Sequence, residues 1–299
     1  FYQETGIKVN CMYFTTNEDM MVQVRVSPGA YDVVFPSDYC VERMIEEGLL
    51  AEINFDNVPH FKYILDNLKN PDYDPENKYS VPFMWGTVGI LYNTTKVDEP
   101  VDSWGILWDE KYAKEIFMLD SIRDTMGLTL KYLGYSMNTR DPQQLKEATQ
   151  KLIDQKALVK AYQVDETKDK MAAGEGALGV VWSGDALYAM DLNEDLAYAV
   201  PKEGSNVWID GMCITKASKN KEAAQKFIDF MCRPDIAAMN QACIYYSSPI
   251  KQVVEGYSDE EKANTALNPT DDILERCEFF NDISGNMDLY DKIWMEIRA

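Results

Sequence analysis

Strand-like and helix-like patterns alternate along this chain of 299 residues. Short apolar runs, rich in β-branched and aromatic residues, are separated by segments whose apolar residues have helical spacing. This alternation is typical of an α/β protein and predicts a parallel or mostly parallel sheet with helices on its faces. A chain of this length, 46% hydrophobic, can form two domains with buried cores.

The predicted elements are bounded by turn residues and helix caps. The predicted strands are residues 7–14, 31–35, 79–83, 86–92, 115–119, 177–182, 196–200 and 208–214. The predicted helices are residues 17–26, capped by Asn17, residues 38–47, capped by Ser37, and residues 142–155, 166–173, 221–231 and 234–241.

The chain opens on Phe1-Tyr2-Gln3-Glu4-Thr5-Gly6, the pattern of a last helical turn with glycine just past its end. We therefore expect an upstream segment with at least a strand and most of a helix, and a signal sequence for export can precede it. No apolar run approaches the about 18–20 residues that a membrane span needs.

The charge balance is strongly acidic, with 50 Asp and Glu against 29 Lys and Arg and a formal net charge of −21. This disfavours nucleic-acid binding, which needs a basic surface, and suits cationic partners or simple solubility. The six cysteines have no zinc-ligand spacing, so neither a metal site nor a cofactor is expected. Buried free thiols are the favoured interpretation, and disulfides stay open in an oxidising compartment.

Three patterns in the sequence have catalytic associations. Residues 174–179 match G-x-G-x-x-G, but a helix precedes them and a strand follows, the reverse of a dinucleotide site. His60 is the only histidine and lies in a predicted loop, so no Ser-His-Asp set can be built elsewhere. Asp120 and Asp124 have the residue type of a glycosidase pair. The alternative for them is a helix cap and an ion-paired side chain beside Arg123.

Trp208-Ile209-Asp210 lies within a predicted strand. Side chains alternate along a strand, so the indole and the carboxylate two residues apart face the same space. An aromatic ring attracts a cation through its quadrupole, and a carboxylate attracts it by charge. The motif therefore suggests a site for an organic ammonium, against the alternative of a core tryptophan beside a surface aspartate.

Further aromatic residues lie at predicted strand ends or in loops, each beside a polar or acidic residue: Tyr39, Trp182 and Tyr246. Ligands of open α/β sheets bind in the loops that follow the strands. An aromatic box with carboxylates at its ends suits a flexible polyammonium chain, because rings stack on methylene groups and carboxylates offset the desolvation of the charges.

Several short motifs resemble those of the spermidine/putrescine-binding proteins, the substrate-binding components of polyamine ABC transporters. The order and spacing of short motifs over essentially the whole chain carry the resemblance. These motifs are Glu4-Thr5-Gly6-Ile7-Lys8-Val9, Tyr31-Asp32-Val33-Val34-Phe35-Pro36-Ser37, Ser37-Asp38-Tyr39, Leu133-Gly134-Tyr135-Ser136 with Asn138-Thr139, Trp208-Ile209-Asp210 and Arg233-Pro234-Asp235.

The resemblance implies a two-lobed periplasmic-binding-protein fold of type II, in which each lobe is a mixed sheet flanked by helices. Lobe one would comprise residues 1–87 and 209–253, without the family's first strand, and lobe two residues 88–208 and 254–299. A polyamine such as spermidine or putrescine would bind in the cleft and be delivered to a transporter permease. The protein would be periplasmic or a cell-surface lipoprotein, with no enzymatic activity and no cofactor.

The resemblance also implies the ligand-binding residues. Two tryptophans would wall the methylene chain, two aspartates would hold ammonium groups, two tyrosines would close the box, and a serine would add a hydrogen bond. They are Ser37, Tyr39, Asp124, Trp182, Trp208, Asp210 and Tyr246.

Three positions depart from the family's pattern. Asp124 stands where the family often has Glu, Ser121 where some members have an acidic ligand residue, and Phe280 where some members have a polar one. The alternative within the fold is a receptor for another small solute, such as a sugar or an amino acid. A polyamine sensor without transport and an acid/base glycoside hydrolase are the alternatives outside that role.

Overall fold

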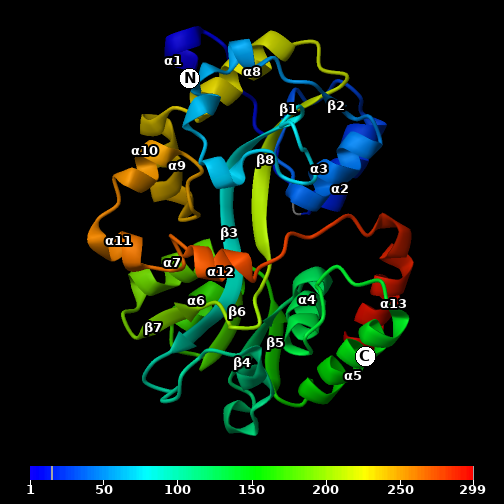
Figure 1. Cartoon of the computed structure of the whole chain (residues 1–299), viewed down its shortest axis with the longest axis vertical. Coiled ribbons are helices and arrows are strands. Elements are labelled where there is room, and N and C mark those ends of the chain that lie inside the picture. Colours follow the sequence, from blue (N-terminus) through cyan, green and yellow to red (C-terminus); the bar gives the residue numbers. More distant parts are fainter. Residues whose placement is uncertain (15, 299) are drawn as a thin grey trace. The chain divides into compact units, whose positions relative to one another are not determined.

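The computed structural model describes residues 1–14 and 16–298, which divide into two compact units. The first unit comprises Phe1–Trp85, Trp208–Ile244 and Ser248–Tyr257. The second comprises Gly86–Val207, Tyr245–Ser247 and the chain from Ser258 onward. Strands β3 (Ser80–Asn93) and β8 (Val207–Thr215) contribute residues to both units (Figure 1).

The first unit builds a small sheet on β8. Its other elements are α1 (Tyr2–Thr5), α2 (Asn17–Val26), β1 (Val33–Val34), α3 (Asp38–Glu46), β2 (Leu50–Ala51), η1 (Phe55–Asn57), η2 (Pro59–Tyr63), η3 (Asp66–Leu68), α8 (Lys221–Met231), α9 (Pro234–Ile244) and α10 (Lys251–Glu255). Strands β1 and β2 both pair antiparallel with β8, with Val34 opposite Cys213 and Leu50 opposite Thr215.

The core of the first unit packs α2 and α3 against β1 and β8. Met20 and Val24 are four residues apart on α2, and Cys40 and Met44 are four apart on α3, so each helix buries one apolar stripe. Each fully buried side chain of this size contributes about 1.5–3 kcal/mol of hydrophobic stabilisation. This packing holds the start of both helices, where the candidate site lies.

The second unit has a mixed sheet. Its other elements are η4 (Trp104–Trp108), η5 (Glu110–Tyr112), β4 (Ile116–Leu119), α4 (Ile122–Tyr132), α5 (Pro142–Gln155), β5 (Val159–Gln163), α6 (Glu166–Ala172), β6 (Leu178–Trp182), α7 (Ser183–Leu192), β7 (Leu196–Ala199), α11 (Asp259–Ala263), α12 (Asp271–Glu275), η6 (Ser284–Asn286) and α13 (Met287–Arg298). Strand β3 pairs antiparallel with β6 and β7, whereas β4 pairs parallel with β5 and β6.

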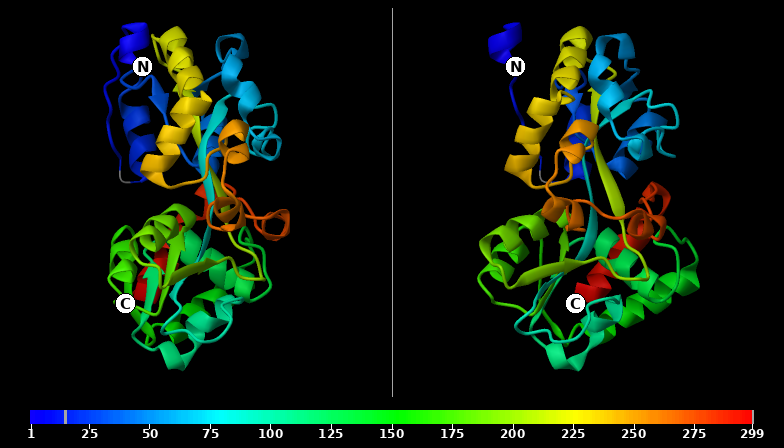
Figure 2. Two further views of the ribbon diagram at one scale, coloured as in Figure 1. Left: turned by 90° about the vertical axis from the view of Figure 1, so that its left-hand side faces the viewer. Right: turned by 60° about the vertical axis from the view of Figure 1, so that its left-hand side comes forward.

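Two groups of helices pack on this sheet (Figure 2). Helices α4, α5 and α13 share one buried cluster, which includes Met126, Leu152 and Ile293. Helices α6 and α7 share another with β4 and β6, which includes Phe117 and Met171. The sheet is thus covered by apolar helix faces. Polar side chains lie in the segments that follow β4 and β6, including Asp124 and Asp185.

The prediction of a mostly parallel sheet is wrong. Residues on β1, β2, β6 and β7 pair antiparallel with their neighbours, and both kinds of pairing occur in the second unit. Alternation of strands and helices predicts layers, but pairing direction depends on which strands meet after folding. The mixed sheets implied by the family resemblance are what the structure shows.

The predicted strand at residues 7–14 is also wrong. These residues have no strand assignment, and most of their side chains are exposed, including Met12 and Tyr13 at 65% and 92%. An alternating apolar pattern forms a strand only where a neighbour completes the backbone hydrogen bonds, and no pairing of this segment occurs within the described residues. The two predicted strands at residues 79–83 and 86–92 are one continuous strand, β3.

Among the described residues, no helix is both long and apolar enough to cross a membrane. The six cysteines are free thiols in the described chain, and Cys40, Cys213 and Cys232 are buried.

Candidate functional site

The first group of site residues forms around Asp210 on β8, and we call Ser37, Tyr39 and Asp210 the Asp210 cluster. Ser37 and Asp210 form an antiparallel β-bridge, and the Gly211 N–H donates to the Pro36 carbonyl at 2.8 Å. The Ser37 hydroxyl then donates to Asp210 Oδ1 at 2.7 Å. Ser37 is the N-cap residue of α3, as predicted, but its side chain makes no capping hydrogen bond because it serves Asp210 instead.

Asn17 connects the Asp210 cluster to the start of α2. Its Nδ2 donates to Ser37 Oγ at 3.1 Å and to the Tyr39 hydroxyl at 3.2 Å, and its Oδ1 accepts from Ser37 N at 3.1 Å. The Tyr39 hydroxyl donates onward to Glu18 Oε1 at 3.2 Å. The prediction that Asn17 caps α2 is wrong: Thr16 is the cap and accepts from Asp19 N, since the Asn17 amide is used by the loop.

Asp38 stabilises the same loop through hydrogen bonds to the backbone. It was not predicted as a site residue. Its carboxylate is buried and accepts from Tyr39 N at 2.7 Å and from Ile209 N at 3.4 Å. One side chain therefore ties the loop after β1 to the strand that carries Trp208 and Asp210.

Asp210 is half-buried on a strand whose other residues are buried, and this partial burial dominates its electrostatics. It raises the pKa of this carboxyl to about 6, although the hydrogen bond from Ser37 opposes the rise. Trp208 lies two residues earlier on β8 and is only 8% exposed. Burial also raises the pKa of the Tyr39 hydroxyl, so this group stays a neutral hydrogen-bonding partner near neutral pH.

The second group of site residues begins at Asp124, in the first turn of α4. Strand β4 ends at Leu119, and Ser121 caps the helix that follows. The Ser121 hydroxyl accepts from Asp124 N at 3.4 Å and donates to Asp124 Oδ2 at 2.6 Å. Asp124 is 6% exposed, and burial raises its pKa to about 6 against the lowering effects of Ser121 and Arg123.

Two positions that depart from the family's pattern lie beside Asp124. Ser121 holds the carboxylate, as described above. Phe280 is buried, and its ring lies under the Arg123 guanidinium, whose carbon is 4.4 Å from the ring centroid. Arg123 also donates to the Asn281 carbonyl at 3.1 Å. Phe280 therefore positions a cation near Asp124 instead of supplying a polar ligand group.

Trp182 and Tyr246 belong to the second unit, where α7 follows β6. Trp182 is the last residue of β6 and pairs with Val88. The Tyr246 ring packs on the backbone of Gly184, with ring atoms 2.2–2.6 Å from where a Cβ would lie. The Tyr246 hydroxyl hydrogen-bonds Asp185, and Lys168 Nζ lies 3.3 Å from that carboxylate. Any side chain at position 184 would collide with the Tyr246 ring, so this packing requires glycine.

The structure thus brings together Ser37, Tyr39, Trp208 and Asp210 in the first unit. In the second unit it places Asp124 on α4 and brings Trp182 into the same β6–α7 turn as the residues that hold Tyr246. Sequence reasoning missed the supporting side chains of Asn17 and Asp38. Asp38 occurs in the sequence only as part of the motif Ser37-Asp38-Tyr39, and nothing in that motif indicates that its carboxylate is buried.

The residues considered for catalysis, Asp120 and His60, form ion pairs or hydrogen bonds with other side chains in the structure. Asp120 pairs with Arg298 at 2.5 Å, so one carboxylate of the suggested glycosidase pair is held by a cation. His60 lies in η2, a short 3-10 helix, and its Nδ1 lies 2.8 Å from Asp229 Oδ2. The glycines at 174 and 176 end α6 and lead into β6, as predicted.

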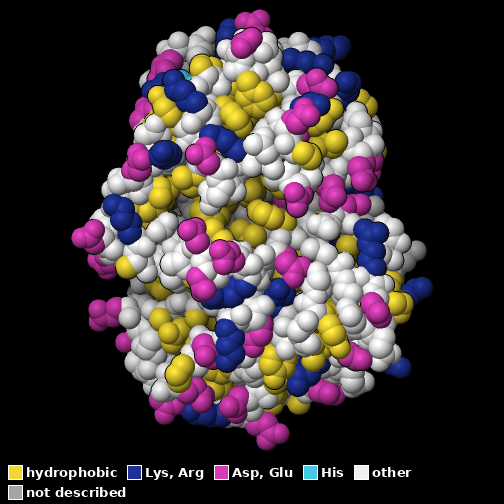
Figure 3. All heavy atoms as spheres, in the orientation of Figure 1, with side chains coloured by type: hydrophobic (Ala, Val, Ile, Leu, Met, Phe, Trp, Pro, Cys, Tyr) yellow, Lys and Arg dark blue, Asp and Glu magenta, His cyan; other side chains and the backbone are white. Residues whose placement is uncertain are grey.

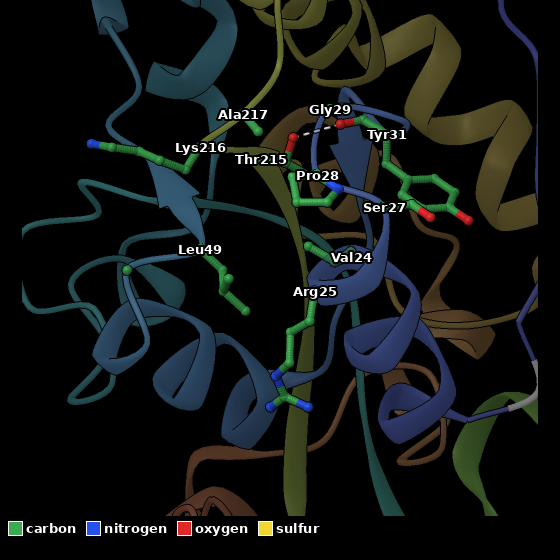
Figure 4. Close-up of a pocket in the computed structure, with 11 residues that line it drawn as sticks. Val24, Arg25, Ser27, Pro28, Gly29, Tyr31, Leu49, Thr215, Lys216 and Ala217 are labelled. Atoms are coloured by element: carbon green, nitrogen blue, oxygen red, sulfur yellow. Dashed lines mark hydrogen bonds between the residues drawn. The ribbon is translucent and has the colours of Figure 1, made fainter.

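A small cavity of about 80 Å³ in the first unit involves none of the predicted site residues (Figure 4). It lies between the end of α2 and the end of β8. The Thr215 hydroxyl there donates to the Tyr31 carbonyl at 2.5 Å, and Arg25 pairs with Glu47 at 2.6 Å. Because these polar groups are already engaged and the lining is largely apolar, this cavity offers no set of groups for a charged ligand.

Comparison with known proteins identifies the family of the chain. The profile of the bacterial extracellular solute-binding proteins matches residues 1–270. The chain therefore belongs to the family of bacterial extracellular solute-binding proteins. It is 33% identical over 301 residues to the spermidine/putrescine-binding periplasmic protein of Salmonella typhimurium, covering 100% of this chain and 86% of that protein. The family predicted from the sequence motifs is confirmed.

Solved structures give the same result for the fold. The spermidine/putrescine ABC transporter substrate-binding protein PotD of Streptococcus pneumoniae has a TM-score of 0.90 at 36% identity, covering 99% of this chain and 92% of that chain. The Tp0655 (TpPotD) lipoprotein of Treponema pallidum has a TM-score of 0.89 at 25% identity, covering 99% and 93%. The predicted periplasmic-binding-protein fold is confirmed.

Proposed function

We propose that this chain binds a polyamine of the spermidine/putrescine class and delivers it to the permease of an ABC transporter. One observation carries the proposal. Asp210 and Asp124 are carboxylates whose pKa burial raises to about 6, and neither forms an ion pair with Lys or Arg in the described chain. Burying such a charge is costly until a cation arrives, so an ammonium group completes each site.

The proposed ligand residues are the seven that the family resemblance implies. Asp210 and Asp124 each neutralise an ammonium group, and Ser37 orients the Asp210 carboxylate. The aromatic rings of Tyr39, Trp182, Trp208 and Tyr246 contact the ligand's methylene and ammonium groups, with each cation–π contact contributing about 0.5–2 kcal/mol.

The same proposal assigns the lobes, the location and the partners. Lobe one comprises residues 1–87 and 209–253, lobe two comprises residues 88–208 and 254–299, and the protein works in the periplasm or as a cell-surface lipoprotein. The acidic net charge supports a cationic ligand and no nucleic-acid partner. On the face drawn in Figure 3, Lys and Arg lie scattered among Asp and Glu. The proposed activity is binding, without a catalytic step.

Titration calorimetry on the full chain tests the proposal with spermidine, putrescine and 1,4-butanediol, the uncharged counterpart of putrescine. We expect saturable binding of at least one amine and none of the diol, because the diol cannot neutralise the carboxylates. An arm with a sugar and an amino acid tests the other solute classes. Absence of binding of either polyamine at high micromolar concentration, or tighter binding of the sugar or amino acid, contradicts the proposal.

A further inference from the structure

Asn17 is the residue that connects both hydroxyl groups of the Asp210 cluster. We propose that it is a positioning residue: its amide directs the Ser37 hydroxyl proton onto one oxygen of Asp210 and leaves the other oxygen for a ligand ammonium. This inference rests on the proposed polyamine binding and concerns how the first unit prepares its carboxylate.

The orientation of the Asn17 amide follows from its backbone partner. The Ser37 N–H can only donate, so the atom that faces it at 3.1 Å is the amide oxygen. The amide nitrogen therefore faces Ser37 Oγ at 3.1 Å and the Tyr39 hydroxyl at 3.2 Å. Both hydroxyl oxygens accept from one NH2 group.

The direction of the two hydroxyl protons follows in turn. A hydroxyl has a single proton, and an oxygen that accepts from Asn17 keeps that proton for another partner. For Ser37 this partner is Asp210 Oδ1 at 2.7 Å, and for Tyr39 it is Glu18 Oε1 at 3.2 Å. Asn17 thus favours the arrangement in which both hydroxyl groups donate to carboxylates.

In this arrangement the two carboxylate oxygens of Asp210 have different hydrogen-bonding roles. Oδ1 accepts the Ser37 proton, and Oδ2 accepts no hydrogen bond from the residues that the structure describes. A charge-assisted bond of this kind favours the ionised carboxylate and fixes its plane. A fixed, ionised Oδ2 is the acceptor that an ammonium N–H needs, whereas a Ser37 hydroxyl that rotated away would leave Oδ1 without its donor and the carboxylate plane free to turn.

The test compares Asn17→Ala with Ser37→Ala, the double variant and Thr16→Ala in the full chain. Thr16→Ala is the matched control, because it removes the cap of the same helix without touching the loop. We expect Asn17→Ala to weaken binding of the tighter-binding polyamine by about tenfold, the size of one or two lost hydrogen bonds. The double variant should bind as weakly as Ser37→Ala alone, and Thr16→Ala should bind like the wild type.

A titration separates positioning from a merely structural role. The pKa of Asp210, followed by the carboxyl carbon signal in ligand-free protein, should rise in Asn17→Ala and in Ser37→Ala but not in Thr16→Ala. Neighbouring Asp38, Glu18 and Tyr73 are unchanged in these variants, and Tyr73 stays neutral because burial raises its pKa. An unchanged Asp210 titration in Asn17→Ala overturns the inference, as does unchanged affinity. If the wild type binds no polyamine, the proposed function fails while this titration still decides the role of Asn17.

Discussion

Asp210 in the first unit and Asp124 in the second accept the same kind of hydrogen bond from a serine hydroxyl, at 2.7 Å and 2.6 Å. Burial raises the pKa of both to about 6. Ser121 is three residues before Asp124, at the cap of one helix, whereas Ser37 is 173 residues from Asp210 along the chain. A local turn thus prepares one carboxylate, and tertiary packing prepares the other.

The supports of the two carboxylates differ as well. Around Asp210, Asn17 and Asp38 hold the loop through hydrogen bonds between separate elements. Around Asp124, the nearby charge of Arg123 lowers the pKa, and the guanidinium stacks on Phe280. The first carboxylate depends on a polar network, and the second depends on a helix cap and a neighbouring cation.

The largest expected effect is that of Asp210→Asn on polyamine binding. Removing the charge that pairs with a buried ammonium should weaken affinity by about 2–3 kcal/mol. Asp124→Asn should have a smaller effect, because Arg123 already offsets part of that charge. Calorimetry measures both, with the exposed Asp56→Asn of the first unit as a control expected to bind like the wild type. Unchanged affinity in Asp210→Asn removes this residue from the site.

Gly184→Ala tests whether the second unit positions its aromatic residue by close backbone packing. A Cβ at position 184 collides with the Tyr246 ring at 2.2 Å, so we expect a loss of about 1–3 kcal/mol in the free energy of unfolding. Urea unfolding measures this loss. The matched background is Tyr246→Ala, in which adding Gly184→Ala should cost little; an equal cost in both backgrounds contradicts the packing argument.

Acidic pH should weaken binding through both carboxylates. Their folded pKa values of about 6 lie above ordinary values near 4, so each is ionised above pH 6 and becomes neutral as the pH falls through 6. Lowering the pH from 7 to 5 should weaken affinity by about tenfold or more. Calorimetry at both values checks this, and the double variant Asp124→Asn/Asp210→Asn should show a much smaller dependence. A flat profile in the wild type means that neither carboxylate meets the ligand.

The smallest expected effect is a difference between Ser121→Ala and Ser37→Ala in the free energy of unfolding. Ser121→Ala removes a helix cap as well as the hydrogen bond to Asp124, so the part of its cost that comes from the cap, about 1 kcal/mol, should remain at pH 5, where Asp124 is protonated. Ser37→Ala removes no cap, so its cost, also about 1 kcal/mol, should be present at pH 8 and decrease at pH 5, where Asp210 is protonated. Urea unfolding at both values measures the difference. An equal cost of the two variants at pH 5 contradicts the distinction between local and tertiary support.

Local pattern predicted many elements well. Helices α5 and α8 have the predicted bounds, because apolar spacing in both helices and the Asp141 cap of α5 act within one helix. Residues 7–14 have an alternating pattern as clear as that of the observed strands, yet they pair with no strand in the described chain. Helix boundaries depend on neighbours in sequence, whereas a strand depends on a partner that the sequence does not identify.

The sequence by itself determined the chain's family, the alternating elements and the residue types that suit an ammonium ligand. Ser121 caps α4 beside Asp124 through a contact that is local in sequence, although neither this helix nor its cap was predicted. The tertiary structure alone decided the direction of the strands and the bond from Ser37 to Asp210. It also decided that Asn17 serves the loop after β1 instead of capping its own helix. These features depend on contacts between distant segments, and only packing of the core brings those segments within hydrogen-bonding distance.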